Sequence, residues 1–114
     1  MNLKKNALAL ALSLGLGLSA GFASAEEIYI PLISKGFQHQ FWQVVKAGAE
    51  QAAKDLNVKV TFEGPESEAM VDKQIDMLSA AISKKPAAIG YAALDAKAAI
   101  PLLKKAQAAK IPVI

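Results

Sequence analysis

The sequence predicts an α/β fold in which a parallel sheet lies between helices, in three αβα layers. Short apolar, β-prone runs alternate with longer stretches of helical periodicity over residues 26–114. The stretch 87–94 (AAIGYAAL) is almost wholly apolar, as expected for a central strand covered on both faces. The resulting order β-α-β-α-β-α-β implies right-handed crossovers between parallel strands. Because such sheets bind ligands beyond the carboxyl ends of their strands, we expect a site in the loops after the first and third strands.

The first predicted strand covers 27–34 (EIYIPLIS) and is followed by a polar and aromatic loop and then by a helix. Asn57 is a plausible end of that helix, and residues 58–63 alternate apolar and charged side chains, as a short second strand would. The helix itself is predicted from an apolar stripe at spacings of three and four residues, which consists of Phe41, Val44, Val45, Gly48, Ala49, Ala52 and Leu56.

A second helix is predicted after the break at Gly64-Pro65, with Ser67 as its cap and with acidic residues in its first turn. Lysines followed by Pro86 predict its end, because proline cannot continue a helix. A third helix is expected from about Pro101 to about Lys110, and a fourth strand at 111–114. The buried stripe of the second helix is predicted to consist of Val71, Ile75, Leu78 and Ile82.

Residues 1–25 are predicted to be a cleaved secretion signal and not part of the fold. Lys4 and Lys5 form a basic start, an apolar run follows, and Ala23-Ser24-Ala25 has the small residues of a processing site. The apolar run is shorter than a membrane span requires. We therefore expect a periplasmic protein whose mature chain begins at Glu26, and residues 26–114 would form a small, incomplete domain.

Composition excludes several classes of function. The chain has no cysteine, which excludes disulfides, thiolate metal sites and a lipid-anchoring cysteine, so we expect no stable membrane anchor. Without arginine or a basic cluster, no nucleic acid partner is expected. There is no phosphate-binding glycine motif, and His39, as the single histidine, cannot form a multi-histidine metal site. We predict no enzymatic activity, no metal and no cofactor.

The segment 34–42 (SKGFQHQFW) is the most informative part of the chain for function. Aromatic rings stack on the C–H faces of sugar rings, and amide, imidazole and ammonium groups bond sugar hydroxyls. This makes a carbohydrate pocket one interpretation, while spacing alone equally allows Phe41 and Trp42 to begin the core stripe of the helix. The candidate ligand-binding residues are Lys35, Gln38, His39, Phe41 and Trp42 in this segment, together with Asp95 after the third strand.

Several segments resemble the ribose- and galactose-type periplasmic sugar-binding proteins. They are the loop that ends in paired aromatics, the D-x-Q-I-x-x-L pattern beginning at Asp72, and the final P-L-L-K-K-A-x-A-A-x-I-P-V-I. The resemblance implies a partial N-terminal lobe of a type 1 periplasmic binding protein with a Rossmann-like sheet. It also implies that Phe41 and Trp42 stack on the sugar while His39 bonds a hydroxyl. Ribose-type members read Asn-Pro-Phe-Phe at this loop, whereas this chain reads His39-Gln40-Phe41-Trp42, which argues against ribose itself as the ligand. The family also has glycine at the position of Lys110, so the third helix ends with an unusual residue.

By this resemblance, the whole protein would be the extracytoplasmic binding subunit of an ABC importer. Two lobes would close over a sugar or polyol, and the closed form, a monomer, would dock on the permease. A periplasmic sensor that presents the same fold to a chemoreceptor or sensor kinase is the alternative. A LacI-type repressor shares the fold but needs a DNA-binding helix-turn-helix in front, which the predicted secretion signal excludes.

Overall fold

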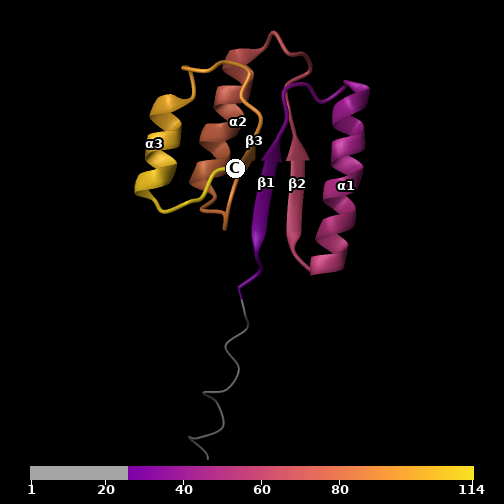
Figure 1. Ribbon diagram of the computed structural model, residues 1–114. Coiled ribbons are helices and arrows are strands. Elements are labelled where there is room, and N and C mark those ends of the chain that lie inside the picture. The colour runs from indigo at the N-terminus through magenta and orange to yellow at the C-terminus, as the bar shows by residue number, and fades with distance from the viewer. Residues whose placement is uncertain (1–25) are drawn as a thin grey trace, which may run out of the picture.

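The computed structural model describes residues 26–114, and the predicted secretion signal at 1–25 lies outside them. The three strands form a parallel sheet in the order β2-β1-β3, which confirms the predicted α/β class (Figure 1). Within the described residues, no helix has the length and apolar character needed to cross a bilayer. In chain order the elements are β1 (Tyr29–Ile33), α1 (Gln40–Leu56), β2 (Lys59–Glu63), α2 (Val71–Ser83), β3 (Gly90–Tyr91) and α3 (Ile100–Ala108).

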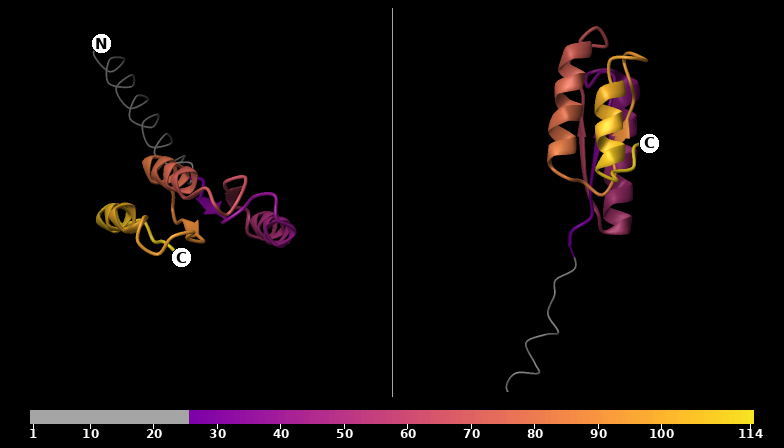
Figure 2. Two further views of the ribbon diagram at one scale, coloured as in Figure 1. Left: turned by 90° about the horizontal axis from the view of Figure 1, so that it is seen from above. Right: turned by 90° about the vertical axis from the view of Figure 1, so that its left-hand side faces the viewer.

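The helices lie on both faces of the sheet, as the predicted three layers require. Figure 2 shows α2 and α3 on one side of the strands and α1 on the other. Handedness explains this arrangement: the chain moves from β1 to β2 in one direction and then back past β1 to β3, and right-handed crossovers place the two connecting helices on opposite faces. The strand order therefore reverses between β1 and β3.

The two faces are covered unequally. The buried core lies between the sheet and the α2–α3 pair, where Leu78, Ile89 and Ala106 are fully buried. On the other face, no residue of α1 is buried. Five of the seven residues of the stripe predicted for α1 are in fact exposed, including Phe41 (58%), Val44 (68%) and Leu56 (71%). The stripe was thus correct as a helical pattern and wrong as a prediction of burial, because the sheet beneath α1 is narrow.

The predicted boundaries need three corrections. The second helix begins at Val71, after Met70, and Ser67 does not cap it; the Ser67 carbonyl instead accepts the Met70 amide within the preceding turn. The third strand is reduced to Gly90–Tyr91. The predicted fourth strand runs alongside β3 but forms a single parallel bridge, Ile89 to Val113.

Each helix is followed by a non-glycine residue in the left-handed region. These residues are Asn57, Lys85 and Lys110, with φ of 53°, 51° and 60°. The Asn57 amide donates to the carbonyls of the last turn, which confirms the predicted end of α1. Lys110, where the resemblance implies glycine, is therefore a position at which glycine would adopt the backbone conformation with less strain.

Candidate functional site

Three loops meet at the carboxyl edge of the sheet, beside the reversal of strand order. The loop after β1 is tied to the one after β2 by backbone bonds, Ser34 N–H to Glu63 O and Phe37 N–H to Pro65 O, both 2.8 Å. The loop after β3 holds Asp95. This edge is where ligands bind in open parallel sheets, so the predicted site residues lie in the expected part of the fold.

His39 caps helix α1. Its backbone is extended, and its Nδ1 accepts the Phe41 amide at 3.2 Å. A ring nitrogen that accepts a hydrogen bond carries no proton, so the neutral ring has its proton on Nε2, which is free to donate. The side chain is exposed. Sequence reasoning predicted a polar ligand contact here and missed the capping role, because histidine is not among the common cap residues.

Phe41 and Trp42 pack edge to face, with ring centroids 4.9 Å apart and planes at 83°. They have different surroundings. Phe41 is 58% exposed, whereas Trp42 is half-buried against the face of the sheet that α1 covers only loosely, which we call the open face. The ring of Phe41 is therefore exposed to a ligand, and the half-buried ring of Trp42 packs against it.

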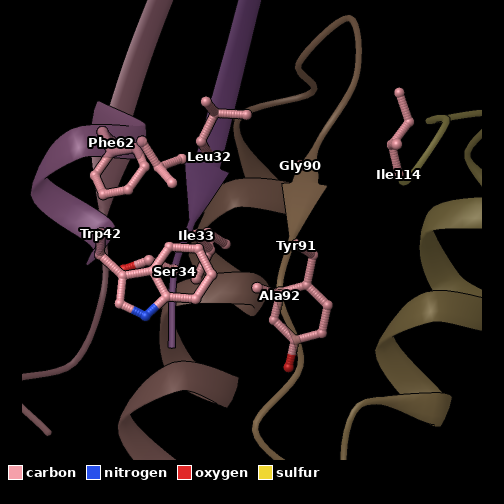
Figure 3. A pocket seen from close by; sticks show the side chains of 10 residues that line it. Leu32, Ile33, Ser34, Trp42, Phe62, Gly90, Tyr91, Ala92 and Ile114 are labelled. Carbon is pink, nitrogen blue, oxygen red and sulfur yellow. The ribbon is translucent and has the colours of Figure 1, made fainter. Parts of the chain in front are cut away.

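An apolar cavity of about 210 Å³ lies between α1 and this open face (Figure 3). Its floor is a row across the sheet, since Leu32 is paired in register with Phe62 on one side and with Gly90 on the other. Trp42 and Val45 line the cavity on the side of α1, opposite the sheet. The cavity has mainly apolar walls, which suits packing or a ring face better than a charged ligand.

Ser34 lies at the end of this cavity and is 1% exposed. Its Oγ has no hydrogen-bond partner among the described residues. A buried hydroxyl without a partner is costly, so this atom is a donor and acceptor available to a water or a ligand group. Ser34 was not among the predicted site residues. Its position directly after an apolar strand, at the ligand-side edge of the sheet, could have indicated it.

Asp95 organises its own loop. Its Oδ1 accepts the amides of Lys97 at 2.8 Å and Ala98 at 2.7 Å, and these bonds, that from Ala98 first, hold the pKa of the carboxyl below its usual 3.8. Burial, followed by the nearby Asp95 charge, raises the pKa of Tyr91 above 10.0. The second oxygen of Asp95 has no bond among the described residues and faces solvent.

Lys35 and Gln38 lie in the loop after β1, with Lys35 half-buried and Gln38 exposed. No hydrogen bond within the described region joins either of them, or Asp95, to the aromatic pair. The structure thus gathers the six predicted residues at one edge without linking them into a bonded cluster. Residues 26–114 also contain no group of three or more His, Asp or Glu side chains that could hold a metal ion.

Gln74 is the functional candidate that the sequence analysis missed. It is fully buried at the start of α2, and it makes four hydrogen bonds, three to the loops after β1 and β3 and one to the hydroxyl of Tyr91 on β3 itself. Helical spacing contained the signal, since position 74 lies four residues before Leu78 on the buried side. A glutamine at a core position requires partners on every polar atom.

A sequence profile of the family described as periplasmic binding protein domain matches residues 30–114. The chain belongs to the periplasmic binding protein family. The resemblance seen in the sequence is thereby confirmed, and so is the fold class. Among curated proteins, none matches the sequence significantly.

Solved structures of this family superpose well on the chain. A protein of Brachyspira murdochii described as an ABC transporter, LacI family transcriptional regulator is 42% identical, with a TM-score of 0.72 over 76% of this chain and 27% of its own. A carbohydrate transporter solute-binding protein of Agrobacterium radiobacter, in complex with D-arabinose, is 39% identical, with a TM-score of 0.73 over 79% and 30%. An ABC transporter periplasmic solute-binding protein of Actinobacillus succinogenes with bound D-allose is 28% identical, with a TM-score of 0.72 over 76% and 30%.

The chain therefore spans roughly 30% of the length of these periplasmic binding proteins. Two of these relatives have a sugar bound, D-arabinose in one and D-allose in the other, and both are described as solute-binding proteins of transporters. The family is extracytoplasmic and binds solutes.

Proposed function

We propose that this chain is the first part of the solute-binding subunit of an ABC importer, and that the subunit binds a sugar or sugar-like polyol. One observation supports this most strongly. In a periplasmic binding protein domain, an exposed aromatic ring, Phe41, stands at the ligand-side edge of the sheet beside free polar groups. That combination suits a ligand with an apolar ring face and a rim of hydroxyls.

Each predicted residue has a role that its chemistry allows. The exposed face of Phe41 would stack on the sugar ring, and Trp42 would support Phe41 through their edge-to-face contact. The Nε2–H of His39 would donate to a hydroxyl, while its Nδ1 holds the helix cap. Lys35, Gln38 and the free oxygen of Asp95 would bond further hydroxyls.

Residues 26–114 would form an incomplete N-terminal lobe. The open sheet face beside α1 and the exposed apolar residues of that helix support this, because an apolar surface of this kind is normally covered in a finished domain. In the whole protein, a ligand held between two lobes would stabilise the closed form, and that form would be recognised by the permease. The whole protein would be a monomer without a membrane anchor, and it would catalyse no reaction.

Secretion to the periplasm would follow cleavage after Ala25. Mass spectrometry of periplasmic material should therefore give a mature chain that begins at Glu26. A secreted protein that still began at Met1 would contradict the predicted signal.

The ligand is tested by calorimetry on the full-length mature protein with D-arabinose, D-allose and a panel of related aldoses and polyols. We expect saturable binding of at least one of these sugars and none of an amino acid control. Binding of the amino acid with no sugar bound would refute the proposal. Loss of sugar uptake on deletion of the gene would favour transport, and unchanged uptake with lost chemotaxis or signalling would favour the sensor alternative.

A further inference from the structure

The loops after β1 and β3 separate where the sheet ends. The last backbone bond between the two strands runs from the Ala92 amide to Ile33 O, at 3.0 Å. Beyond this bond, the carbonyls of Ser34 and Ala92 accept no backbone amide from a neighbouring strand. Buried carbonyls in this situation require a donor from elsewhere.

Gln74 supplies that donor. Its Nε2 donates to Ser34 O at 2.9 Å and to Ala92 O at 2.8 Å. Its Oε1 accepts the Tyr91 hydroxyl and the Leu94 amide, both at 2.9 Å. All donors and lone pairs of the carboxamide are used, and a flipped amide would place an oxygen against two carbonyls, so a single orientation is possible.

We propose that Gln74 is a positioning residue that sets the separation of the two ligand-side loops, and through it the ligand affinity, without touching the ligand. The inference rests on the proposed function in one respect, because affinity is the property being set. The first loop continues into His39 and the aromatic pair, and the second continues into Asp95. One rigid amide in the core of α2 therefore fixes both walls of the candidate site relative to each other.

Gln74→Glu is the decisive variant because it keeps the shape and both acceptor contacts but removes both donors. A carboxylate would repel the two carbonyls, and a protonated carboxyl would restore one donor. We expect the affinity for D-arabinose or D-allose, whichever the wild type binds, to fall about ten-fold at pH 8 and to recover to within about three-fold at pH 5. A purely structural role would lower stability and leave this pH profile flat.

Comparison with wild type at each pH cancels the titration of other groups. Tyr91 bonds Gln74, and its pKa lies above 10.0, while that of Asp95 lies below 3.8, so neither titrates between pH 5 and 8. The remaining ionisable side chains on the elements that contact Gln74 are Lys35 and His39 in the loop after β1, Lys97 in the loop after β3, and Asp72, Lys73 and Asp76 on α2.

Ile82→Val is the matched control, since Ile82 is a buried residue of the same helix and has no hydrogen bond to either loop. It should lower the unfolding midpoint and leave affinity unchanged. Equal loss of affinity in both variants, or a flat pH profile for Gln74→Glu, would overturn the proposal.

Hydrogen exchange in the ligand-free wild type tests loop positioning even if no sugar binds or the variant does not fold. The Leu94 amide, which donates to Gln74, should exchange at least about ten-fold more slowly than the Ala96 amide in the same loop. Equal exchange would refute the positioning role. Absence of sugar binding by the wild type would instead refute the proposed function, while slow Leu94 exchange would still support positioning.

Discussion

Replacing Phe41 and Trp42 one at a time separates ligand binding from packing. Because 58% of Phe41 is exposed, about 100 Å² of an aromatic side chain of ordinary size is available to a ligand. If a sugar ring covers half of that area, burial is worth about 1.3 kcal/mol, which is about ten-fold in affinity. Phe41→Ala should therefore weaken sugar binding about ten-fold and cost less than about 1 kcal/mol of stability.

Trp42→Ala should lower stability more, and sugar affinity less, than Phe41→Ala does. The indole packs on the open face of the sheet, and truncating a half-buried tryptophan should cost about 2 kcal/mol of unfolding free energy, since full burial would cost about 3–5 kcal/mol. Its effect on affinity should be smaller than that of Phe41→Ala, because Trp42 acts through its contact with Phe41.

The assay is calorimetry with the bound sugar, paired with urea unfolding of each variant of the full-length protein. Val44→Ala is the control, because Val44 lies on α1, is 68% exposed and is further from the helix start. It should change neither quantity appreciably. If Phe41→Ala lowered stability as much as Trp42→Ala and left affinity unchanged, the aromatic pair would be packing material and the site assignment would fail.

Three further outcomes are expected. Since the folded pKa of Asp95 is lowered, its stabilisation is present above pH 3.8 and lost as pH falls through the folded value, so wild type and Asp95→Ala should converge in stability below that pH. Gly48→Ala should stabilise α1 by about 0.5–1 kcal/mol in urea unfolding, because no atom lies within 4 Å of the added Cβ. Gly64→Ala should instead cost about 1–3 kcal/mol of stability, because its Cβ would lie 2.1 Å from Ser34 Oγ. Residues 26–114 alone should unfold broadly and self-associate in sedimentation, and a sharp transition of a monomer would show that this segment is a complete domain.

The order of the elements was predictable because it depends on local patterns. Apolar periodicity identified the helices. Asn57 marked the end of α1 correctly, because asparagine tolerates the left-handed backbone conformation that ends a helix, and this preference is local. The cap at Ser67 was not predictable in the same way. Where α2 begins depends on how the preceding turn packs, and that turn extends to Met70.

The sequence predicted at which edge of the sheet the candidate residues would lie, and it did not predict their contacts. Phe41 and Trp42 are neighbours in the sequence, and neighbouring residues point about 100° apart around a helix, so a shared role could not be deduced from adjacency. Gln74 was recognised only as part of the D-x-Q-I-x-x-L pattern. Its role at the site could not be predicted, because its partners lie 40 and 18 residues away, in segments that only the folded sheet brings together.

The two margins of the sheet have opposite chemistry. On one margin is β2, which begins with Lys59 and ends with Glu63; Lys59 lies 5.3 Å from the centre of the Tyr29 ring, and Tyr29 also bonds Thr61 at 3.0 Å. Charges at an edge discourage a further strand from adding there. The other margin, formed by residues 111–114, is apolar and ends in the exposed Ile114. In residues 26–114 alone, unwanted strand pairing between copies would therefore begin at the apolar margin and not at the charged one.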